Sequence, residues 1–484
     1  MVMLKGLKWL IFLSLFVYIV VRAVTVPITH DEAYSYFLVK TNYVVAMAGT
    51  ANTHWINALG MKIGSFLLGD LPWQLRIFSI LAWLIYGFSA IKISEKIQNK
   101  LLGLSLFICL VANPFLLDFF SLARGYGLAC AFTLASIWKA LKLLEKNLWE
   151  LKDWVPIVFF GSLAVFSNYT TFYFFMALVC SFLSFAIYKR GGQHFLPIRF
   201  SKWLIIIVGT SIAAISNLLF IKLYTGDLEY GGNDGLIYSV FGSLVSGSLY
   251  VPNMTNDIIV FAYVVFLLVV VAVAYSGYIF LVDKTITPLS FLSSIVLWML
   301  LFNISFHYAF DTPYLFSRTT LVFYPCIILL FHFLINEIQF AQLKNRFLLG
   351  AFSILLIAVF LYNFIANFNL YYCYEWKDQA DTKRCLDVAN ADGAENILIQ
   401  KWHAGVYINY YSVVKSKQYS FKITPFLPEE IVELSDSFKK TFYEYDHAIL
   451  LPPFNLQQMH NEGLRFTVLE QFHLTGAAVL KIQK

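Results

Sequence analysis

Two adjacent acidic residues, Asp31 and Glu32, follow the first apolar run of the chain. Ionisable side chains at the border of an apolar segment are costly, so a function is the first hypothesis for them. Thr29 and Glu32 also have the spacing of a capping box, in which two side chains satisfy the first N–H groups of a helix. Capping alone and a role as an acid therefore both account for Glu32.

Asp31 is the stronger candidate for catalysis. Adjacent helical side chains point about 100° apart, so the carboxylates of Asp31 and Glu32 cannot serve one spot equally. At the start of a helix, Asp31 stays ionised because the N–H groups there favour negative charge. Such a carboxylate can accept the proton of a hydroxyl group as that hydroxyl attacks a substrate. We therefore predict that Asp31 is a general base.

A second acid and an arginine occur close together, Asp118 in the stretch 113–118 and Arg124 in the stretch 123–127. The guanidinium group is permanently charged, and its fixed donors suit a phosphate. An ion pair between Asp118 and Arg124 that holds two helices together accounts for the same residues equally well.

Three further residues are candidates for phosphate contact: Arg318, His54 and Lys62. Arg318 stands at the start of an apolar run, where arginine side chains commonly just extend toward the membrane surface. His54 could simply satisfy a neighbouring polar group, and Lys62 could be a solvated cation. The sequence leaves each residue open between these roles and a phosphate contact.

The composition identifies the elements that position these residues as membrane helices. Of the 484 residues, 59% are hydrophobic and 13% are charged, whereas soluble domains carry about 25% charged residues. A helix needs about 20 mostly apolar residues to cross a bilayer. We predict eleven spans, near 8–28, 76–93, 101–117, 122–143, 154–168, 169–188, 203–223, 258–281, 288–308, 315–335 and 347–366.

The distribution of Lys and Arg predicts the orientation of the chain. The net charge is +6, but the basic residues recur in short loops between apolar runs rather than on one face. This pattern argues against nucleic acid as a partner and for placement against a membrane. We expect a multi-pass protein of the plasma or inner membrane with a cytoplasmic N-terminus and a C-terminus outside the cytoplasm.

In this orientation the candidate acids and cations all belong to the outer face of the membrane. The spans themselves carry few ionisable groups near their middle. That distribution does not suit a path for ions or protons through the bilayer. It suits a site at the outer interface that handles a lipid phosphate.

Three segments outside the spans have expected structure of their own. Residues 29–75 are too apolar for a solvated loop and are expected to form amphipathic helices along the outer interface. Residues 224–257 are rich in Gly, Tyr, Ser and Asp, which predicts a flexible loop or lid. Residues 367–484, after a membrane module of 1–366, have the composition of a soluble protein. Helical stretches there alternate with strand-like runs, which predicts a small α/β domain with helices near 376–390 and 428–440 and strands at 396–400, 448–451 and 477–482.

The six cysteines predict no metal site, because no Cys-x-x-Cys motif or cluster of His and Cys is present. Cys373 and Cys385 lie outside the spans and could pair, although their spacing does not demand a disulfide.

At the residues named above, the chain resembles the GT-C glycosyltransferases. The closest type is the dolichyl-phosphate-mannose protein mannosyltransferase (family 39) with its bacterial relatives. The stretch 30–34 resembles the Asp-Glu motif that this family has in its first outer loop. His54 with 69–76 resembles the second half of that loop, and 113–118 with 123–126 resembles the pattern of the second outer loop.

Arg318, ahead of Tyr324 and Pro325, is similar to a family feature near the last spans. The chain departs from the family at one point. Trp55 and Ile56 follow His54, where family members often have two prolines.

The resemblance implies a polytopic α-helical membrane protein of GT-C type, with about 11 transmembrane helices and a small soluble α/β domain at the C-terminus. It implies an enzyme, a hexosyl- or pentosyltransferase that uses a polyprenyl-phosphate sugar and inverts the sugar carbon. The acceptor would be a lipid, glycan or protein outside the cytoplasm.

The same resemblance assigns roles to the candidate residues. Asp31 is the base, with Glu32 or Asp118 as a second acid. The donor phosphate is bound by cations, for which the candidates are Arg124, Arg318, His54 and Lys62. The resemblance does not define a cofactor, and a divalent metal (Mg or Mn) between the acids and the phosphate is compatible with this assignment.

Two other classes of function remain open from the sequence. A flippase or transporter of lipid-linked glycans needs polar residues across the middle of the membrane, and the spans show few. A ligase or polymerase of lipid-linked glycans also works at the outer face. It predicts a catalytic site in 224–257 and makes Asp31 and Glu32 dispensable.

Overall fold

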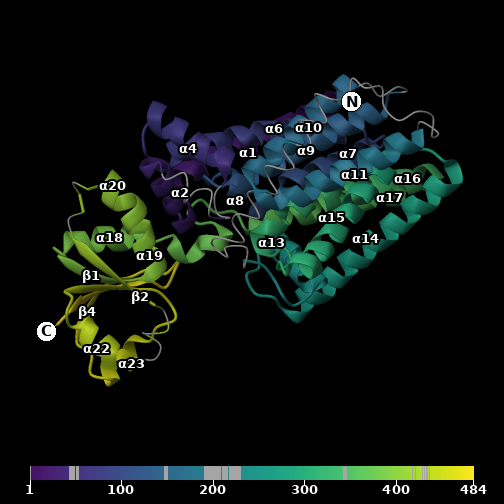
Figure 1. Ribbon diagram of the computed structural model, residues 1–484. Helices are drawn as coiled ribbons and strands as arrows, with labels where there is room; N and C mark the ends of the chain where they lie inside the picture. Colours follow the sequence, from purple (N-terminus) through teal and green to yellow (C-terminus); the bar gives the residue numbers. More distant parts are fainter. Residues whose placement is uncertain are drawn as a thin grey trace. The chain divides into compact units, whose positions relative to one another are not determined.

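The computed structural model describes residues 2–42, 50, 54–146, 151–189, 209, 216, 230–341, 346–416 and 418–483, the last range without 420, 428, 430, 432, 433 and 435. The chain forms two compact units (Figure 1). We call the first the membrane unit; it comprises Met1–Val20, Val44–Met61 and Arg76–Phe368. We call the second the tail unit; it comprises Val21–Tyr43, Lys62–Leu75 and Asn369–Lys484. The tail unit therefore combines the C-terminal residues with two short segments from the first 75 residues.

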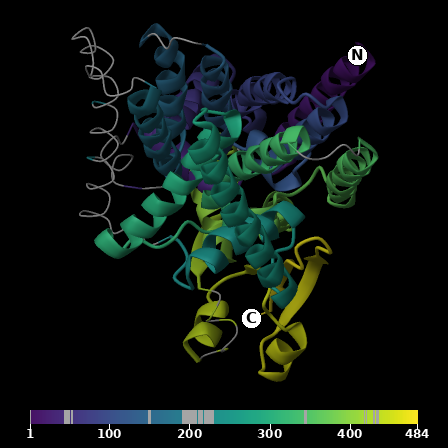
Figure 2. The same ribbon diagram turned by 90° about the vertical axis from the view of Figure 1, so that its right-hand side faces the viewer.

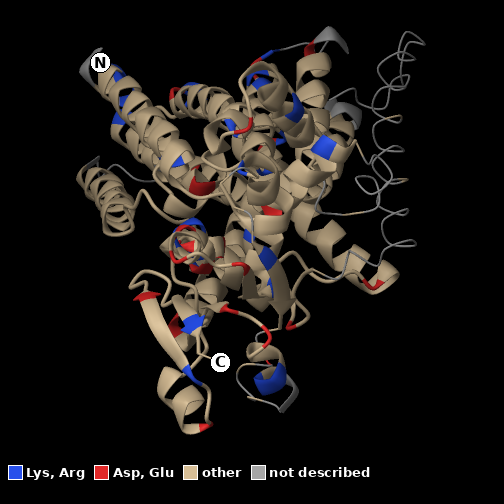
Figure 3. Ribbon diagram, turned by 90° about the vertical axis from the view of Figure 1, so that its left-hand side faces the viewer, with Lys and Arg blue, Asp and Glu red and all other residues tan. Residues whose placement is uncertain are grey.

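Long apolar helices dominate the membrane unit. Among the described residues, seven helices are long and apolar enough to cross a bilayer. They are α1 (Val2–Thr25), α6 (Ile77–Ser94), α9 (Gly125–Leu144), α14 (Asn256–Asp283), α15 (Pro288–Phe310), α16 (Phe323–Ala341) with the preceding η5 (Ser317–Val322), and α17 (Arg346–Ala366). Most of their length carries neither Lys and Arg nor Asp and Glu (Figure 3). The protein is therefore an integral membrane protein.

The predicted spans agree with the observed helices. Seven of them match the seven long helices, and two match the shorter apolar helices α10 (Leu151–Ser167) and α11 (Phe172–Lys189), the second preceded by the turn η1 (Tyr169–Thr171). One matches a bent pair of helices, and the last, 203–223, lies outside the described residues.

The predicted span 101–117 is wrong as a single helix. α7 (Lys100–Val111) and α8 (Pro114–Phe120) are bent by 57° at the break between them. The Asn113 side chain accepts a hydrogen bond from the backbone N–H of Leu116, and Pro114 occupies the first turn of α8. A proline suits the start of a helix but cannot continue a preceding one, because it has no N–H to donate. The break places Asp118 on a short helix of its own.

Residues 230–257, the described part of the expected loop or lid, are largely helical. The π-helix η4 (Ile237–Gly242) runs directly into α13 (Ser243–Leu249). Val240 and Phe241 are fully buried. The burial of such apolar side chains outweighs the Gly and Ser content of the segment, which had indicated flexibility.

Close packing in the membrane unit depends on small residues of α9, which contacts both α6 and α10 (Figure 1). A Cβ atom on Gly127 would lie 2.5 Å from the carbonyl oxygen of Phe119. Ser136 donates a hydrogen bond of 2.8 Å to the carbonyl oxygen of Ile157 on α10. Within a bilayer, close contacts and interhelical hydrogen bonds of this kind hold helices together, since lipid chains are as apolar as the side chains.

The tail unit contains a five-stranded sheet in the order β2-β1-β3-β5-β4. β1 pairs in parallel with β2 and β3, while β5 pairs antiparallel with β3 and β4 (yellow in Figure 2). The strands are β1 (Asn396–Gln400), β2 (Lys422–Phe426), β3 (His447–Leu450), β4 (Phe466–Gln471) and β5 (Ala478–Ile482). β1, β3 and β5 confirm the three predicted strands. β2 and β4 are edge strands that were not predicted, because an edge strand needs no continuous apolar run and tolerates residues such as Pro425.

Short helices and an apolar core complete the C-terminal part of the tail unit. Phe438 and Phe442 pack with strand residues such as Leu398 and Leu480. Burying one such aromatic side chain stabilises the fold by roughly 1.5–3 kcal/mol. The helical elements are η6 (Tyr374–Gln379), α18 (Thr382–Ala391), α19 (Lys401–Val406), η7 (Tyr407–Tyr411), α20 (Ser412–Val414), α22 (Asp436–Phe442) and α23 (Leu456–Asn461).

The described residues of the segment 29–75 include three helices, and their place along the outer interface stays a prediction. The helices are α2 (His30–Thr41), α4 (Trp55–Leu67) and α5 (Pro72–Leu75).

The end of α1 is joined to the start of the tail by Arg22, which is fully buried. Its guanidinium group donates to the carbonyl oxygen of Tyr372 at 2.7 Å and to the sulfur of Cys373 at 3.3 Å. Cys373 and Cys385 are buried thiols and do not form a disulfide with each other.

Candidate active site

The first turn of α2 carries the acidic pair on a closed capping box. The hydroxyl oxygen of Thr29 accepts a hydrogen bond from the backbone N–H of Glu32 at 3.3 Å. The Glu32 carboxylate accepts one from the backbone N–H of Thr29 at 3.0 Å. Glu32 is fully buried. Its carboxylate therefore fixes the start of the helix, and a cap of this kind contributes about 1 kcal/mol.

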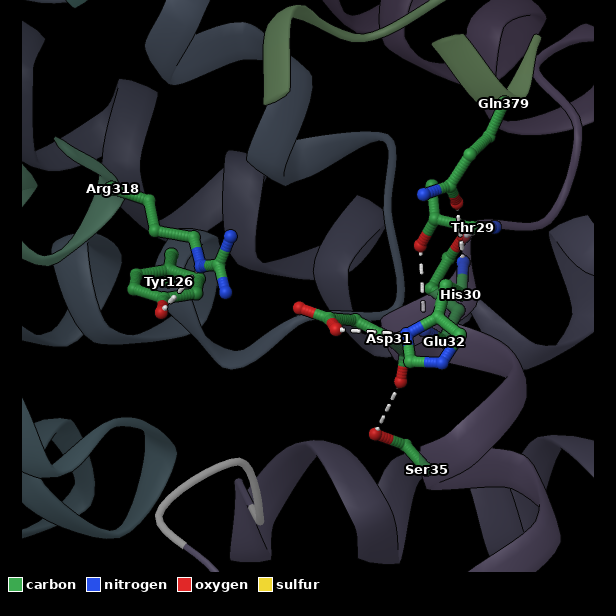
Figure 4. A network of polar contacts seen from close by, with 8 residues as sticks. All are labelled: Thr29, His30, Asp31, Glu32, Ser35, Tyr126, Arg318 and Gln379. Carbon is green, nitrogen blue, oxygen red and sulfur yellow. Dashed lines mark hydrogen bonds and ion pairs between the residues drawn. The ribbon is translucent and has the colours of Figure 1, made fainter. Parts of the chain in front are cut away.

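Asp31 lies one position before Glu32, still in the first turn of α2, and is 7% exposed. One carboxylate oxygen, Oδ1, is 3.6 Å from Nδ1 of His30. The backbone carbonyl of Asp31 accepts a hydrogen bond from the Ser35 hydroxyl at 2.9 Å (Figure 4). Negative charge is favoured in the first turn of a helix by the aligned peptide dipoles. The first turn of α2 therefore favours the ionised form of this largely buried carboxylate.

His30, beside Asp31, is held by residues of the C-terminal segment. The backbone N–H of His30 donates to Oε1 of Gln379 at 2.7 Å (Figure 4). Its ring lies edge to face with the indole of Trp402, with 5.1 Å between the ring centres. Both partners belong to the tail unit, as does α2.

A second histidine, His403, lies on the same tail helix as Trp402. Its Nδ1 is 2.6 Å from the Thr382 hydroxyl, and its Nε2 is 3.7 Å from the Asp378 carboxylate. Burial, with a smaller contribution from the charge of His30, lowers the pKa of His403 to about 3. His403 is therefore neutral near pH 7 and can hold its neighbours without adding charge.

In the membrane unit, Tyr126 brings two of the predicted phosphate ligands together. Nε of Arg318 donates to the Tyr126 hydroxyl at 3.2 Å (Figure 4). The ring of His54 lies 5.1 Å from the Tyr126 ring. The guanidinium carbon of Arg318 also lies 4.7 Å from the centre of the Tyr230 ring. Aromatic faces attract a guanidinium group, so Arg318 is oriented by two tyrosines.

Asp118 and Arg124 are buried in the same unit, with 1% and 0% of their surfaces exposed. The carboxylate of Asp118 accepts a hydrogen bond of 2.9 Å from the Tyr250 hydroxyl. Arg124 occupies the N-cap position of α9. The next residue, Gly125, leaves no room for a side chain, because its Cβ would lie 1.8 Å from the carbonyl oxygen of Ser167. A buried charge is costly unless it is compensated, so these residues need a defined polar setting.

The predicted residues are divided between the two units. Asp31, Glu32 and Lys62 belong to the tail unit, and His54, Asp118, Arg124 and Arg318 belong to the membrane unit. Lys62 donates to Oδ1 of Asn42, the residue that ends α2, at 2.8 Å, and this contact is exposed. None of these contacts tests a role in binding phosphate.

Several neighbours of these residues were not predicted from the sequence. Tyr126 stands within the second motif, and Tyr230 and Tyr250 stand within the Tyr-rich segment 224–257, so a signal existed for them. Gln379 and Trp402 had none, because they follow His30 by 349 and 372 residues and lie in no motif.

The described residues contain no group of three or more His, Cys, Asp or Glu side chains that could hold a metal ion. We therefore derive no chemical step through a metal ion.

No protein-family model matches the chain, and no curated protein sequence matches it. Two solved structures resemble it along nearly its whole length. ArnT from Cupriavidus metallidurans in the apo state has a TM-score of 0.52 and 9% identity over 98% of both chains. ArnT from the same organism bound to undecaprenyl phosphate has a TM-score of 0.52 and 10% identity, covering 98% of this chain and 97% of that one. The fold is of GT-C type, as the sequence resemblance implied.

Proposed function

We propose that this protein is an integral-membrane glycosyltransferase that moves a sugar from a polyprenyl phosphate to an acceptor outside the cytoplasm. The observation that supports it most is the GT-C fold shared with ArnT, whose structure holds undecaprenyl phosphate. The chain adds a carboxylate for the acceptor and two arginines for a phosphate, of which Arg124 is fully buried; these are the two kinds of group that this reaction needs.

In the proposed reaction, Asp31 accepts the proton of an acceptor hydroxyl as its oxygen attacks the anomeric carbon of the sugar. The bond between that carbon and the phosphate oxygen breaks, and the polyprenyl phosphate leaves with the bonding electrons. Attack opposite to the leaving group inverts the sugar carbon. One general base of this kind contributes about 10²–10⁴-fold to a rate.

We assign the leaving phosphate to Arg124 and Arg318, with His54 and Lys62 as further candidates. Fixed cations that meet charge as it develops on the leaving group are among the largest catalytic contributions. Neutralised in this way, a phosphate needs no strong general acid to leave. Glu32 then acts through Asp31, by fixing the start of the helix that carries it.

We also propose that the N-terminus is cytoplasmic and that the tail lies outside. The ion pairs at one end of the membrane unit support this orientation, since they join predicted cytoplasmic loops. Lys146 pairs with Asp153 at 2.6 Å, and Lys96 pairs with Glu145. Lys5 lies 4.0 Å from Glu95.

Maleimide labelling in intact cells tests the orientation. A membrane-impermeant reagent should label a Gln457→Cys variant at once and a Gln98→Cys variant only after permeabilisation, since both positions are exposed. The native cysteines, all buried or half-buried, give a low background. Labelling of Gln98→Cys in intact cells would reverse the assignment.

Transfer from a labelled polyprenyl-phosphate sugar tests the function. Membranes with the wild-type chain should transfer the label, and Asp31→Asn and Asp31→Ala should lower kcat by at least about 100-fold. Asp257→Asn is the matched control, because Asp257 is an exposed acid in the first turn of another helix, α14. Full activity in both Asp31 variants, with the fold intact, contradicts the assignment of the base.

A further inference from the structure

The contacts of His30 connect the candidate base to the C-terminal domain. α2 packs on α19 and η7, which directly follow the sheet strand β1. Tyr36 on α2 lies edge to face with Tyr410 of η7, with 5.4 Å between the ring centres. The continuous segment α19–η7 therefore packs against the middle of α2 as well as against its first turn.

Gly405 of α19 lies against the His30 ring. A Cβ atom at this position would lie 2.6 Å from Cδ2 and 2.8 Å from Nε2 of that ring. Separations under 3.0 Å force one partner to move, so any side chain here displaces His30 or α19. Gly405 has no unusual backbone angle, since it is absent from the residues with positive φ. The close approach of the histidine is therefore the reason for a glycine.

Three residues from two elements of the tail unit, α19 and η6, thus meet His30. Gly405 and Trp402 on α19 contact the His30 ring, and Gln379 at the end of η6 holds its backbone N–H. Around the ring, the titratable groups are Asp31 from α2, Asp378 from η6 and His403 from α19. His30 Nδ1 faces Asp31.

We propose that the C-terminal domain positions the catalytic base: α19 and η6 fix His30, and His30 in turn orients the Asp31 carboxylate. His30 is a positioning residue, and the lack of a side chain at Gly405 leaves room for its ring. This inference rests on the proposed function, and it gives the tail domain a role in the reaction itself. Misplacing a reacting group by about 1 Å can cost 10²-fold in rate.

The first test displaces the ring without removing any polar group. In the full-length chain, Gly405→Ala should expose His30 to diethyl pyrocarbonate, with carbethoxylation of the peptide that contains His30 rising several-fold by mass spectrometry. The kcat of sugar transfer should fall roughly tenfold, with the KM for the donor unchanged. Gly277→Ala is the matched control, a helical glycine of α14 with nothing within 4 Å of the added carbon; it should change neither value.

The modification rate does not depend on transfer, so the two hypotheses fail separately. A wild-type rate of His30 modification and a wild-type kcat in Gly405→Ala overturn the positioning role, whatever Asp31→Asn does. If the Asp31→Asn chain is active, the assignment of Asp31 as the base is overturned instead.

If Gly405→Ala does not fold, a second pair of variants, at His30, tests the proposal. His30→Ala should lower kcat about 10–100-fold at unchanged donor KM, and His30→Gln, which keeps a polar group beside Asp31, should recover part of it. Equal, near-wild-type kcat in both variants overturns the proposal.

Discussion

Asp118 and Arg124 in the membrane unit and Asp31 in the tail unit are held in different ways. The first two stand six residues apart in the sequence, on either side of one helix boundary, and are almost wholly buried. Asp31 stands in the first turn of a 12-residue helix whose neighbours come from the far end of the chain. The backbones of Asp118 and Arg124 are placed by neighbouring helix ends, with one long-range hydrogen bond from Tyr250 to Asp118, whereas the position of the base depends on contacts with the C-terminal segment.

The largest expected effect is at Arg124. Arg124→Ala should lower kcat/KM for transfer by about 10²–10³-fold, because it removes a buried, permanently charged donor from the proposed phosphate site. Lys139→Ala on the same helix α9 is the control, since Lys139 lies over Trp138 and has no assigned role. Unchanged transfer and unchanged donor affinity in Arg124→Ala would leave the arginine with a structural role only.

Two substitutions at Glu32 distinguish a helix-capping role from a role as an acid in the reaction. Glu32→Gln keeps the capping box, because glutamine satisfies the same backbone N–H, and should retain transfer within about threefold. Glu32→Ala should lose the cap, about 1 kcal/mol, and lower the midpoint of thermal unfolding. A Glu32→Gln chain that folds normally but is inactive would identify Glu32 as a second acid.

An effect smaller than that of Arg124→Ala is expected at Tyr126, which joins Arg318 and His54 in the membrane unit. Tyr126→Phe keeps the ring but removes a hydrogen bond to a charged group, worth roughly 1.5–3 kcal/mol. The KM for the donor should rise about tenfold or more, as measured by initial rates at varied donor. Tyr443→Phe, which removes a tyrosine hydroxyl bond in the tail to the carbonyl oxygen of Gly463, is the comparison and should leave the donor KM unchanged.

The smallest effect concerns how the stability of the tail unit against unfolding depends on pH. Because burial lowers the pKa of His403 to about 3, below its ordinary value of about 6.5, the unfolded state binds more protons between these pH values. Stability contributed by His403 is therefore present above about pH 6.5 and is lost as the pH falls toward 3. The unfolding midpoint should fall over this window and should fall less in His403→Gln. His473→Gln, at an exposed position, should keep the wild-type slope.

The local features of the chain could be predicted because their causes are local. The spacing of Thr29 and Glu32 is sufficient for a capping box, and the apolar runs are sufficient for the spans. The strand β1 was predicted because its central residues, Ile397–Ile399, form an apolar run rich in β-branched side chains. The break at Pro114 could have been predicted too, since proline ends a preceding helix.

The helices at 237–249 could not be predicted in the same way. Gly and Ser weaken a helix in isolation, and only the burial of neighbours such as Phe241 makes it stable.

The sequence by itself determined a membrane protein with many apolar spans, the helix that begins at His30, and the acids and arginines available for chemistry. Each of these follows from residue type and spacing over a few turns of chain. Only the tertiary structure decided that Tyr126 holds Arg318 and that Gly405 lies against His30. Such pairs are separated by 192 and 375 residues, and the free energy that joins them comes from packing that no short stretch of sequence contains.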